Sequence, residues 1–423
     1  MSIGQSGAGS LTIWGGYRLH ASTASVDIGF NSTGAGALSV LGFSASTTNF
    51  NNHIVSSADL GLTRIGVGGV GSLNISGGGA ISASGIEVAS SFGSVGTIAM
   101  NTIAIPGGNS LTSTLSAATM SIGGSGIASG GNGTLLLSSS SRATIGSLKL
   151  WSGGHVVLNG GQLNLTSLDD TNATSGAIDF TSGTLQLSTG TLYIGAAHAL
   201  GQNVTISSGK ALIVGGTTHV LASGSFSVTG GIFQTANFIN DGVIDSSNAP
   251  GGKVTFRETD IIKGNGTYRG HFEGGIWSPG QSPGILSVDG VLDMTPDATL
   301  EIELAGPATG AAGTDFDQLY VVAGSGNQFK PGGTLKIVPL SGAQVGGTYR
   351  IVRTGGGGAA IDTSRYFANL ASSGTIYNDG SLKYEVNYDS QFIDVHLTAV
   401  PEPAGAAILL LSSAMLFRRR RSA

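Results

Sequence analysis

A short phrase of alternating polar and apolar positions recurs along most of the chain. It consists of a glycine, a small or polar residue, and then apolar residues at every second position, as in Gly36-Ala37-Leu38-Ser39-Val40. Alternation with a period of two predicts a β-strand with one apolar face and one polar face. A glycine at the strand entrance permits the backbone conformation that a tight corner needs. Further copies begin at Gly9, Gly71, Gly133, Gly161 and Gly183.

The spacing of these copies predicts the architecture. Recurrence of one strand phrase every few tens of residues is typical of stacked coils, in which each coil buries its apolar face against its neighbours. We therefore predict an all-β protein whose residues 1–250 form a parallel β-helix (β-solenoid) with an inward core. A β-sandwich is the structural alternative, because it also uses short alternating strands. Equivalent, buried coil positions are expected for Leu11, Leu38, Leu73, Leu163 and Leu185.

Composition supports a folded β-structure. Of the 423 residues, 72 are glycine, but these follow no collagen triplet, and 40% of all residues are hydrophobic, which excludes a disordered chain. Only 10% are charged, against about 25% in typical soluble proteins. The surface is therefore expected to be covered by Ser, Thr, Asn and Gly, as suits a long β-structure.

Charge and cysteine content exclude several classes of function. The net charge is −5, and four of the 19 Lys and Arg residues lie in one run at 418–421. Without a basic patch in the rest of the chain, binding to a nucleic-acid backbone is excluded. Cysteine is absent, which excludes disulfides and thiolate metal sites. No cofactor is predicted.

The first residues already belong to the repeat. Met1-Ser2-Ile3-Gly4 leads directly into the first strand phrase, with no basic or apolar leader segment. For an exported protein we expect further coding sequence upstream, with more strand phrases and a signal peptide.

The pattern of the sequence changes after residue 250. Residues 251–290 form a Gly/Pro-rich junction that contains two closely spaced Ser-Pro-Gly turns between Ser278 and Gly284. Strand phrases follow, such as Gly284-Ile285-Leu286-Ser287-Val288 and Thr299-Leu300-Glu301-Ile302-Glu303-Leu304. This combination resembles the autotransporter-associated β-strand repeats of bacterial passenger regions. The resemblance implies a C-terminal, passenger-like β region over residues 291–399.

The last segment, residues 400–423, differs from everything before it. Pro401-Glu402-Pro403 interrupts the strand pattern, because proline cannot donate to a ladder. Residues 404–417 are uncharged and largely apolar, and they predict a short membrane helix of about 21 Å, against a hydrocarbon core of about 30 Å. The anchoring residues are expected to be Ala404, Ile408, Leu409, Leu410, Leu411, Leu416 and Phe417. The stop-transfer residues are expected to be Arg418, Arg419, Arg420 and Arg421, which favour the cytoplasmic side.

The order of tripeptide, apolar helix and arginine cluster resembles the PEP-CTERM sorting signal. This resemblance implies recognition by an exosortase, a membrane-embedded cysteine enzyme that cuts near the tripeptide, here Pro401, Glu402 and Pro403. It also implies an inner-membrane-anchored precursor, and then delivery to the cell surface or to an exopolysaccharide matrix of a Gram-negative-type bacterium.

Candidate catalytic and metal-binding residues are few. The tight acidic pairs are Asp169-Asp170 and Asp315-Phe316-Asp317, and carboxylate clusters on one face of a β-helix are where Ca²⁺ ligands are expected. An acidic turn is the explanation of each pair that the sequence favours. Trp14, Trp151 and Trp277 have the ring type that stacks on sugars, although packing is the simpler role. No metal-binding spacing links the histidines, which are His20, His53, His155, His198, His219, His271 and His396.

Two hypotheses for function follow. The first is a non-enzymatic surface or extracellular-matrix protein, sorted by its tail, with an exosortase, the inner membrane and exopolysaccharide as its partners. The alternative is a β-helix carbohydrate-active enzyme or an adhesin delivered by the same signal. Because the chain offers no convergent acid–base or metal set, the sequence favours the first.

Overall fold

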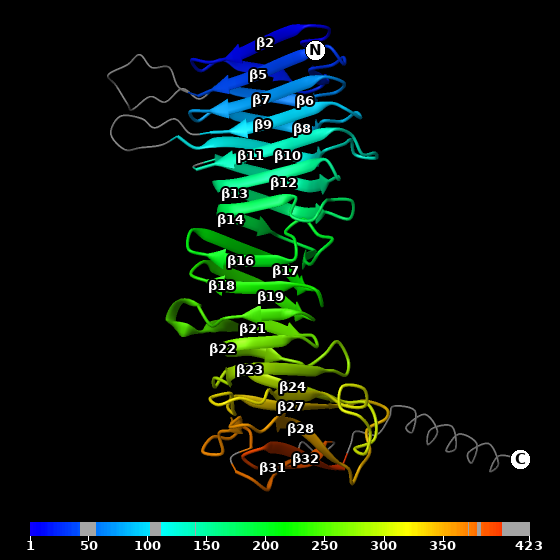
Figure 1. Cartoon of the computed structure of the whole chain (residues 1–423), viewed down its shortest axis with the longest axis vertical. Helices are drawn as coiled ribbons and strands as arrows, with labels where there is room; N and C mark the ends of the chain where they lie inside the picture. Colours follow the sequence, from blue (N-terminus) through cyan, green and yellow to red (C-terminus); the bar gives the residue numbers. More distant parts are fainter. Residues whose placement is uncertain (43–55, 102–110, 140, 371, 379–381, 400–423) are drawn as a thin grey trace, which may run out of the picture. The chain divides into compact units, whose positions relative to one another are not determined.

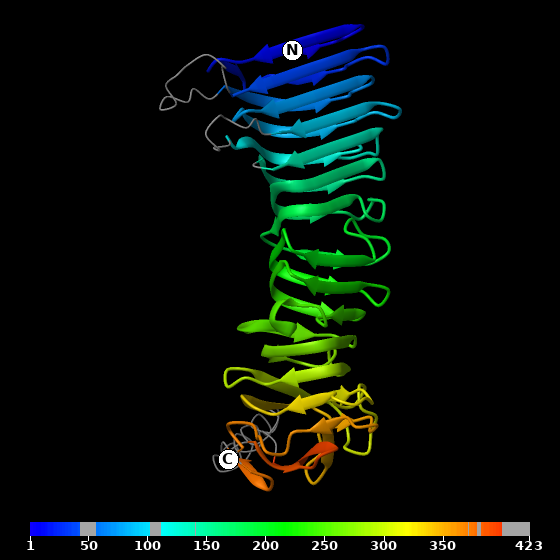
Figure 2. The ribbon, with the colours of Figure 1, turned by 60° about the vertical axis from the view of Figure 1, so that its left-hand side comes forward.

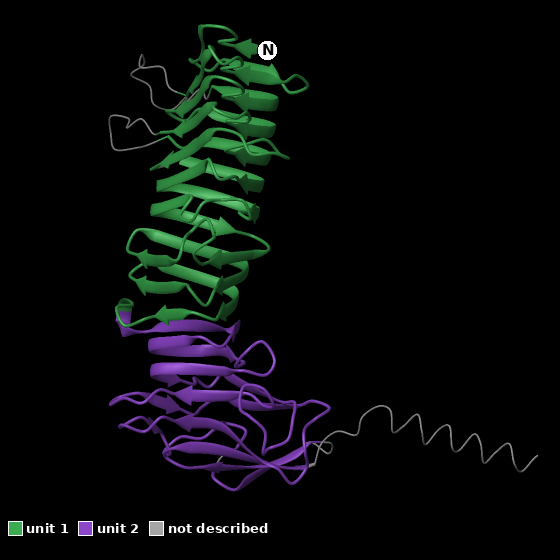
Figure 3. Ribbon diagram, turned by 45° about the vertical axis from the view of Figure 1, so that its right-hand side comes forward, with its two compact units in different colours: residues 1–250 green, residues 251–423 purple. Residues whose placement is uncertain are grey.

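The chain is nearly all β-structure. The computed structural model describes residues 1–42, 56–101, 111–139, 141–370, 372–378 and 382–399. The described part contains 32 strands and one short 3₁₀ turn at Pro250–Gly252, which confirms the predicted all-β class. The chain folds as two compact units, Met1–Pro250 and Gly251–Ala423, which Figure 3 colours separately.

The predicted C-terminal helix, 404–417, lies outside the described residues. Within the described ranges, no helix has the length and apolar character needed to cross a bilayer.

The first unit consists of strands that are between 2 and 16 residues long. Its strands are β1 (Ser2–Ile3), β2 (Ala8–Ile13), β3 (Arg18–Ala21), β4 (Val26–Ile28), β5 (Ala35–Leu41), β6 (Ser57–Ile65), β7 (Val70–Ser76), β8 (Ala80–Val88), β9 (Val95–Met100), β10 (Ser113–Ile122), β11 (Asn132–Ser138), β12 (Ser141–Leu150), β13 (Gly154–Asp169), β14 (Ile178–Leu187), β15 (Thr191–Ile194), β16 (Asn203–Ser207), β17 (Lys210–Val220), β18 (Ser225–Thr229), β19 (Ile232–Asn240) and β20 (Val243–Asp245).

These strands pair in parallel with strands that are one to three elements away along the chain. The first ladder joins β2, β5, β7, β9, β11, β13 and β14 in that order. Figure 1 shows β5, β7, β9 and β11 stacked one above another, and the turned view in Figure 2 keeps this order. Since sandwich sheets are antiparallel, the parallel pairing in this unit disfavours the β-sandwich alternative.

Two further ladders run beside the first. The second joins β3, β6, β8, β10, β12, β13, β14, β17 and β19. The third begins with β1 and β4 and continues through the C-terminal parts of β6, β8, β10, β12 and β13. The strand β13 contributes to more than one ladder, because its N-terminal part pairs with β11 and its C-terminal part pairs with β12.

Apolar side chains stack in register inside these ladders. In the first ladder, Leu38, Leu73, Ile98 and Leu135 are aligned, and each is 0% exposed. At about 25 cal/mol per Å² of apolar surface removed from water, each such side chain stabilises the fold by about 1.5–3 kcal/mol.

The predicted equivalence of five leucines is partly wrong. Leu11, Leu38 and Leu73 align in the first ladder, whereas Leu163 and Leu185 align in the second. Four of them are buried, but Leu11 in the first rung is half-exposed. Strands of both ladders alternate inward and outward positions in the same way, so a phrase of period two cannot tell which ladder a strand joins.

A row of aligned glycines marks the corner at which the first ladder begins. Gly36, Gly71, Gly96, Gly133 and Gly154 are paired successively along the stack. A Cβ on Gly71 would lie 2.2 Å from the backbone nitrogen of Gly66 and 2.5 Å from the oxygen of Ile28. The corner therefore requires glycine because neighbouring backbones approach it too closely for any side chain.

The second unit begins with parallel strands and ends with antiparallel ones. Its strands are β21 (Val254–Lys263), β22 (Thr267–Trp277), β23 (Ile285–Asp293), β24 (Thr299–Leu304), β25 (Gln318–Val321), β26 (Gln328–Lys330), β27 (Thr334–Pro339), β28 (Thr348–Thr354), β29 (Ala360–Ile361), β30 (Thr375–Asn378), β31 (Lys383–Tyr388) and β32 (Phe392–Ala399).

An antiparallel group closes one edge of this second unit. β25 pairs in parallel with β28, and β28 then pairs antiparallel with β32, which is followed by β31 and β30. Arg350 on β28 and Asp394 on β32 form two hydrogen bonds of 3.0 and 3.1 Å across this edge. The unpaired backbone groups that β28 would otherwise expose are thereby covered.

Candidate functional site

The residues singled out in the C-terminal segment all lie outside the described residues. They are the tripeptide Pro401, Glu402 and Pro403, the anchoring residues between 404 and 417, and the arginines at 418–421. Their roles stay predictions from the sequence.

The two carboxylates of the first acidic pair have separate structural partners. Asp169 lies 3.2 Å from the Lys149 ammonium and accepts a hydrogen bond from the Thr171 amide. Asp170 accepts one from the Ala199 amide at 2.9 Å and lies 3.2 Å from the Nδ1 of His198. Burial opposes ionisation of Asp169, but the contacts with Thr171 and Lys149 outweigh it and lower the pKa of Asp169.

The second acidic pair is also engaged. Asp315 accepts a hydrogen bond from the Ala311 amide at 2.7 Å. Asp317 is 0% exposed, and its two oxygens accept hydrogen bonds of 2.8 Å from the backbone nitrogens of Gly284 and Glu303. These bonds tie the start of β25 to the turn before β23 and to β24.

Burial raises the pKa of Asp317 to about 7, although the hydrogen bonds from Glu303 and Gly284 favour the carboxylate. A carboxyl group that titrates near neutrality is often a catalytic acid or base. Here both oxygens are occupied by backbone donors and the side chain is inaccessible, so no substrate atom can reach it. In the described ranges, no group of three or more His, Asp or Glu residues is arranged to hold a metal ion.

Two histidines form a cluster that sequence spacing does not indicate. The Tyr193 ring stacks on His198 at 4.8 Å and lies 5.7 Å from His219. The Nε2 of His219 lies 2.8 Å from a carboxylate oxygen of Asp241. In the same way, the Nδ1 of His198 lies 3.2 Å from a carboxylate oxygen of Asp170. His53 lies outside the described residues.

A row of polar side chains runs along the outer face of the third ladder. The register aligns one residue from each of β4, β6, β8, β10, β12 and β13. We call this set the outer polar row, and its members are Asp27, Arg64, Glu87, Ser121, Lys149 and Asp169. Its charges alternate in sign, and oppositely charged neighbours pair, Asp27 with Arg64 and Lys149 with Asp169. The row therefore has no uniform field for a polyanion.

The most strongly paired part of this row is at β4 and β6. The Arg64 guanidinium donates to both oxygens of Asp27, at 2.7 and 3.1 Å. Only 9% of the Asp27 side chain is exposed, so this bidentate pair compensates a carboxylate that is largely removed from water.

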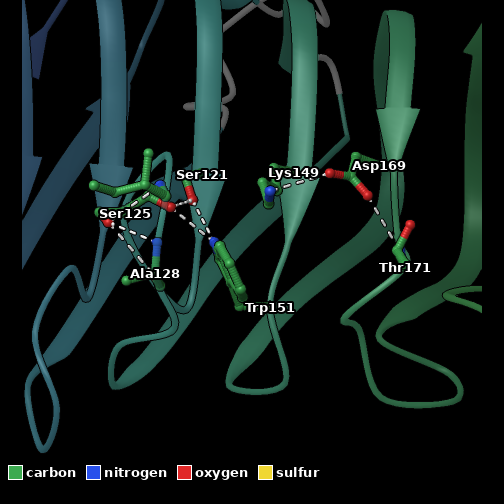
Figure 4. Close-up of polar contacts among 8 residues, drawn as sticks. Ser121, Ser125, Ala128, Lys149, Trp151, Asp169 and Thr171 are labelled. Carbon is green, nitrogen blue, oxygen red and sulfur yellow. Dashed lines mark hydrogen bonds and ion pairs between the residues drawn. The ribbon is translucent and has the colours of Figure 1, made fainter.

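Trp151 lies beside the other end of the outer polar row (Figure 4). Its indole nitrogen donates to the Ser121 hydroxyl at 3.0 Å and to the Ser125 carbonyl at 2.8 Å. The Lys149 ammonium lies 4.6 Å from the ring centroid, and it also contacts Asp169. A half-exposed indole held next to polar groups is suited to stacking on a sugar ring, which is the role that the ring type of the tryptophans allows.

The other two tryptophans have different environments. Trp14 is 57% exposed. Trp277 is 0% exposed, donates to the Gly274 carbonyl and packs against Phe256 and Tyr268. Trp277 therefore has the packing role, and Trp151 is the tryptophan that combines a fixed position with the outer polar row.

The chain matches no protein-family model, and no curated protein is similar to it in sequence.

Proposed function

We propose that the chain is an exported, non-enzymatic protein of the cell surface or the extracellular matrix, with a β-solenoid body and a removable C-terminal sorting signal. One observation carries the proposal: a tripeptide, an apolar segment and an arginine cluster follow one another in residues 400–423, after a body whose acidic pairs are held in structural contacts.

Parallel pairing supports the β-solenoid assignment of the body. Each ladder joins strands that are one coil apart, and the buried apolar residues repeat at the same register. Such a body is stabilised by contacts between neighbouring coils and presents a long outer face. The outer polar row lies on that face, which suits a spacer or a wall that contacts matrix material.

In this proposal the tail acts in three steps. Pro401-Glu402-Pro403 presents an extended backbone to an exosortase, since prolines prevent ladder pairing. The segment 404–417 holds the precursor in the inner membrane at marginal length. The four arginines at 418–421 fix its orientation, with the body outside. Cleavage then releases the body to the surface or to an exopolysaccharide matrix.

The engaged carboxylates weigh against the enzyme alternative. Each of the three carboxylates, Asp169, Asp170 and Asp317, has a backbone or ammonium partner. A general acid or base must also be accessible to substrate, and Asp317 is buried. The alternative makes its own prediction. A purified body that depolymerises a polysaccharide, and loses this activity in Asp169→Asn or Asp317→Asn, would replace our proposal with a carbohydrate-active enzyme.

Replacement of Pro401, Glu402 and Pro403 by alanine tests the sorting function in the source cell. We expect the full-length variant to stay in the membrane fraction, with no mature body at the surface. Pro296→Ala combined with Asp297→Ala is the matched control, because it changes a Pro–acid pair in an exposed turn and should leave delivery unchanged. Normal trimming and delivery of the tripeptide variant would contradict the proposal.

A further inference from the structure

The first ladder is interrupted after β14. The N-terminal part of β14 pairs with β13, and β16 pairs with β18, but no ladder joins β14 to β16 within the described part of the first unit. The second ladder continues through the same level, since Leu185 of β14 pairs with Leu212 of β17. On the interrupted side, the amide of Ile178 donates instead to the carbonyl of Ala199, in the segment between β15 and β16.

A groove opens at this interruption. It has a volume of about 390 Å³, within the range of about 300–1,000 Å³ that is typical of small-ligand pockets. Its lining includes the buried apolar side chains of Ile178 and Phe180 from β14 and of Val204 from β16, together with polar side chains. We call it the β14–β16 groove, and its polar lining residues are His155, Asp179, Asn203, Thr205 and Lys210.

Three of these polar side chains have no partner among the residues that the structure describes. Asp179 and Asn203 are exposed, and His155 is half-exposed. None of the three side chains forms a hydrogen bond or an ion pair with another described residue. Other carboxylates of this unit, such as Asp27 and Asp170, are engaged. Free donors and acceptors therefore lie together at the interruption of the first ladder between β14 and β16.

Lys210 has a different role. Its ammonium donates to the backbone carbonyl of Thr205 at 3.1 Å and lies 5.5 Å from the centroid of the Phe180 ring. The Lys210 ammonium therefore binds a backbone carbonyl on the open edge of β16. A lysine on a strand edge hinders the pairing of another strand, which disfavours an extended peptide as the occupant of the groove.

We propose that the β14–β16 groove binds a neutral sugar unit of a polysaccharide. A carboxylate accepts hydrogen bonds, whereas an amide and an imidazole both donate and accept, and this combination matches a ring that carries several hydroxyl groups. The free carboxylate of Asp179 repels anionic sugars, and the nearby ammonium of Lys210 is already engaged. This inference adds a ligand class to the proposed function of the body. It rests on the proposed function only for the place where the protein meets the polysaccharide.

Calorimetric titration of the purified full-length chain tests this site. The probes are neutral hexasaccharides of β-1,4-glucan, α-1,4-glucan, β-1,3-glucan and β-1,4-mannan, with hexagalacturonate and a six-residue extended peptide for comparison. We expect at least one neutral probe to bind with a Kd in the millimolar range or tighter. Asp179→Ala and Asn203→Ala should each weaken that binding at least tenfold, because each removes a hydrogen-bonding group from the groove.

Asp297→Ala is the matched control, since it removes an exposed carboxylate from a turn of the second unit and should leave binding unchanged. The exposed positions of Asp179 and Asn203 predict unchanged thermal midpoints. Absence of binding to every neutral probe would overturn the proposal. Preferential binding of hexagalacturonate or the peptide, or neutral binding that both groove variants retain, would also overturn it. The sorting function is measured in cells, so its failure is distinguishable from failure of this site.

Discussion

Gly66 and Ala89 occupy equivalent positions, directly after the paired strands β6 and β8. The amide of Gly66 donates to the carbonyl of Ile28 at 2.7 Å, and the amide of Ala89 donates to the carbonyl of Ile65 at the same distance. Both residues have a positive φ, 69° at Gly66 and 57° at Ala89. Ala89 therefore adopts the left-handed conformation that glycine adopts at the equivalent corner, and it does so with a side chain that is 0% exposed.

Replacement of Ala89 by glycine should change the stability of the first unit by less than about 1 kcal/mol. Relief of the left-handed conformation gains about 1–2 kcal/mol, whereas the greater backbone entropy of unfolded glycine costs about 0.5–1 kcal/mol and loss of the buried methyl group costs about 0.8 kcal/mol. Gly66→Ala is the opposite case, since its Cβ would lie 2.2 Å from the Val95 carbonyl oxygen, and it should clearly lower the urea midpoint. A larger fall for Ala89→Gly than for Gly66→Ala would contradict this interpretation of the corner.

Removal of an inward leucine should destabilise the body according to its place in the stack. Leu73→Ala removes a side chain that is 0% exposed between aligned neighbours, and we expect a loss of about 2–5 kcal/mol. Leu11→Ala is the matched control, because Leu11 aligns in the same ladder but is half-exposed. Its loss should be clearly smaller by the same unfolding measurement. Equal losses of stability would show that the burial of each leucine in the ladder does not determine its contribution.

Strand type and burial could be predicted from the sequence here, because alternation is a local property. Leu38 and Leu73 are buried, as expected from their apolar positions in the alternating phrase. The ladder that each strand joins could not be predicted, since Leu38 and Leu163 have the same local pattern but belong to different ladders. That choice depends on how far the chain travels between corners, and loops of variable length obscure it.

Breaking the pair at the start of the outer polar row should be costly. Arg64→Met leaves the largely buried Asp27 carboxylate without its bidentate partner, and we expect a loss of about 1–3 kcal/mol. The double variant Asp27→Asn with Arg64→Met removes the uncompensated charge, so it should recover part of that loss. A double-mutant cycle by chemical unfolding measures the coupling. Additive losses would mean that the two side chains are not coupled.

Asp317 should impose a pH dependence on stability. Its pKa is raised by burial to about 7 in the folded chain, from an ordinary value of 3.8. Between these values the folded state binds the proton and the unfolded state does not, so the contribution of Asp317 to stability is greatest below about pH 4 and is lost as the pH rises to 7. The slope should approach about 1.4 kcal/mol per pH unit.

Asp317→Asn removes this titration, and the difference between the wild-type and variant stability profiles isolates the contribution of Asp317. We expect the wild type to lose stability relative to the variant as the pH rises from 4 to 7. A difference that is constant with pH would contradict a raised pKa for Asp317.

The candidate sites depend on partners that are distant in the sequence. Asp27 and Arg64 are 37 residues apart, and the register of β4 and β6 brings them together. Asp170 and His198 are 28 residues apart, and they meet through segments outside the strands. The β14–β16 groove exists because one ladder is interrupted while its neighbour continues, and no local pattern signals that event. The free carboxylate of Asp179 was for this reason not among the residues that the sequence indicated.

The central claim is that the tail is a sorting device that is removed. The most direct test is mass spectrometric mapping of the C-terminus of the mature protein, purified from the surface and extracellular fractions of the source cell. A protease that does not cut at arginine should be used, so that the last residues stay within one peptide. We predict a C-terminus within a few residues of Pro401–Pro403, without the segment 404–417 and the arginines at 418–421. Mature protein that ends at Ala423 in these fractions would contradict the account.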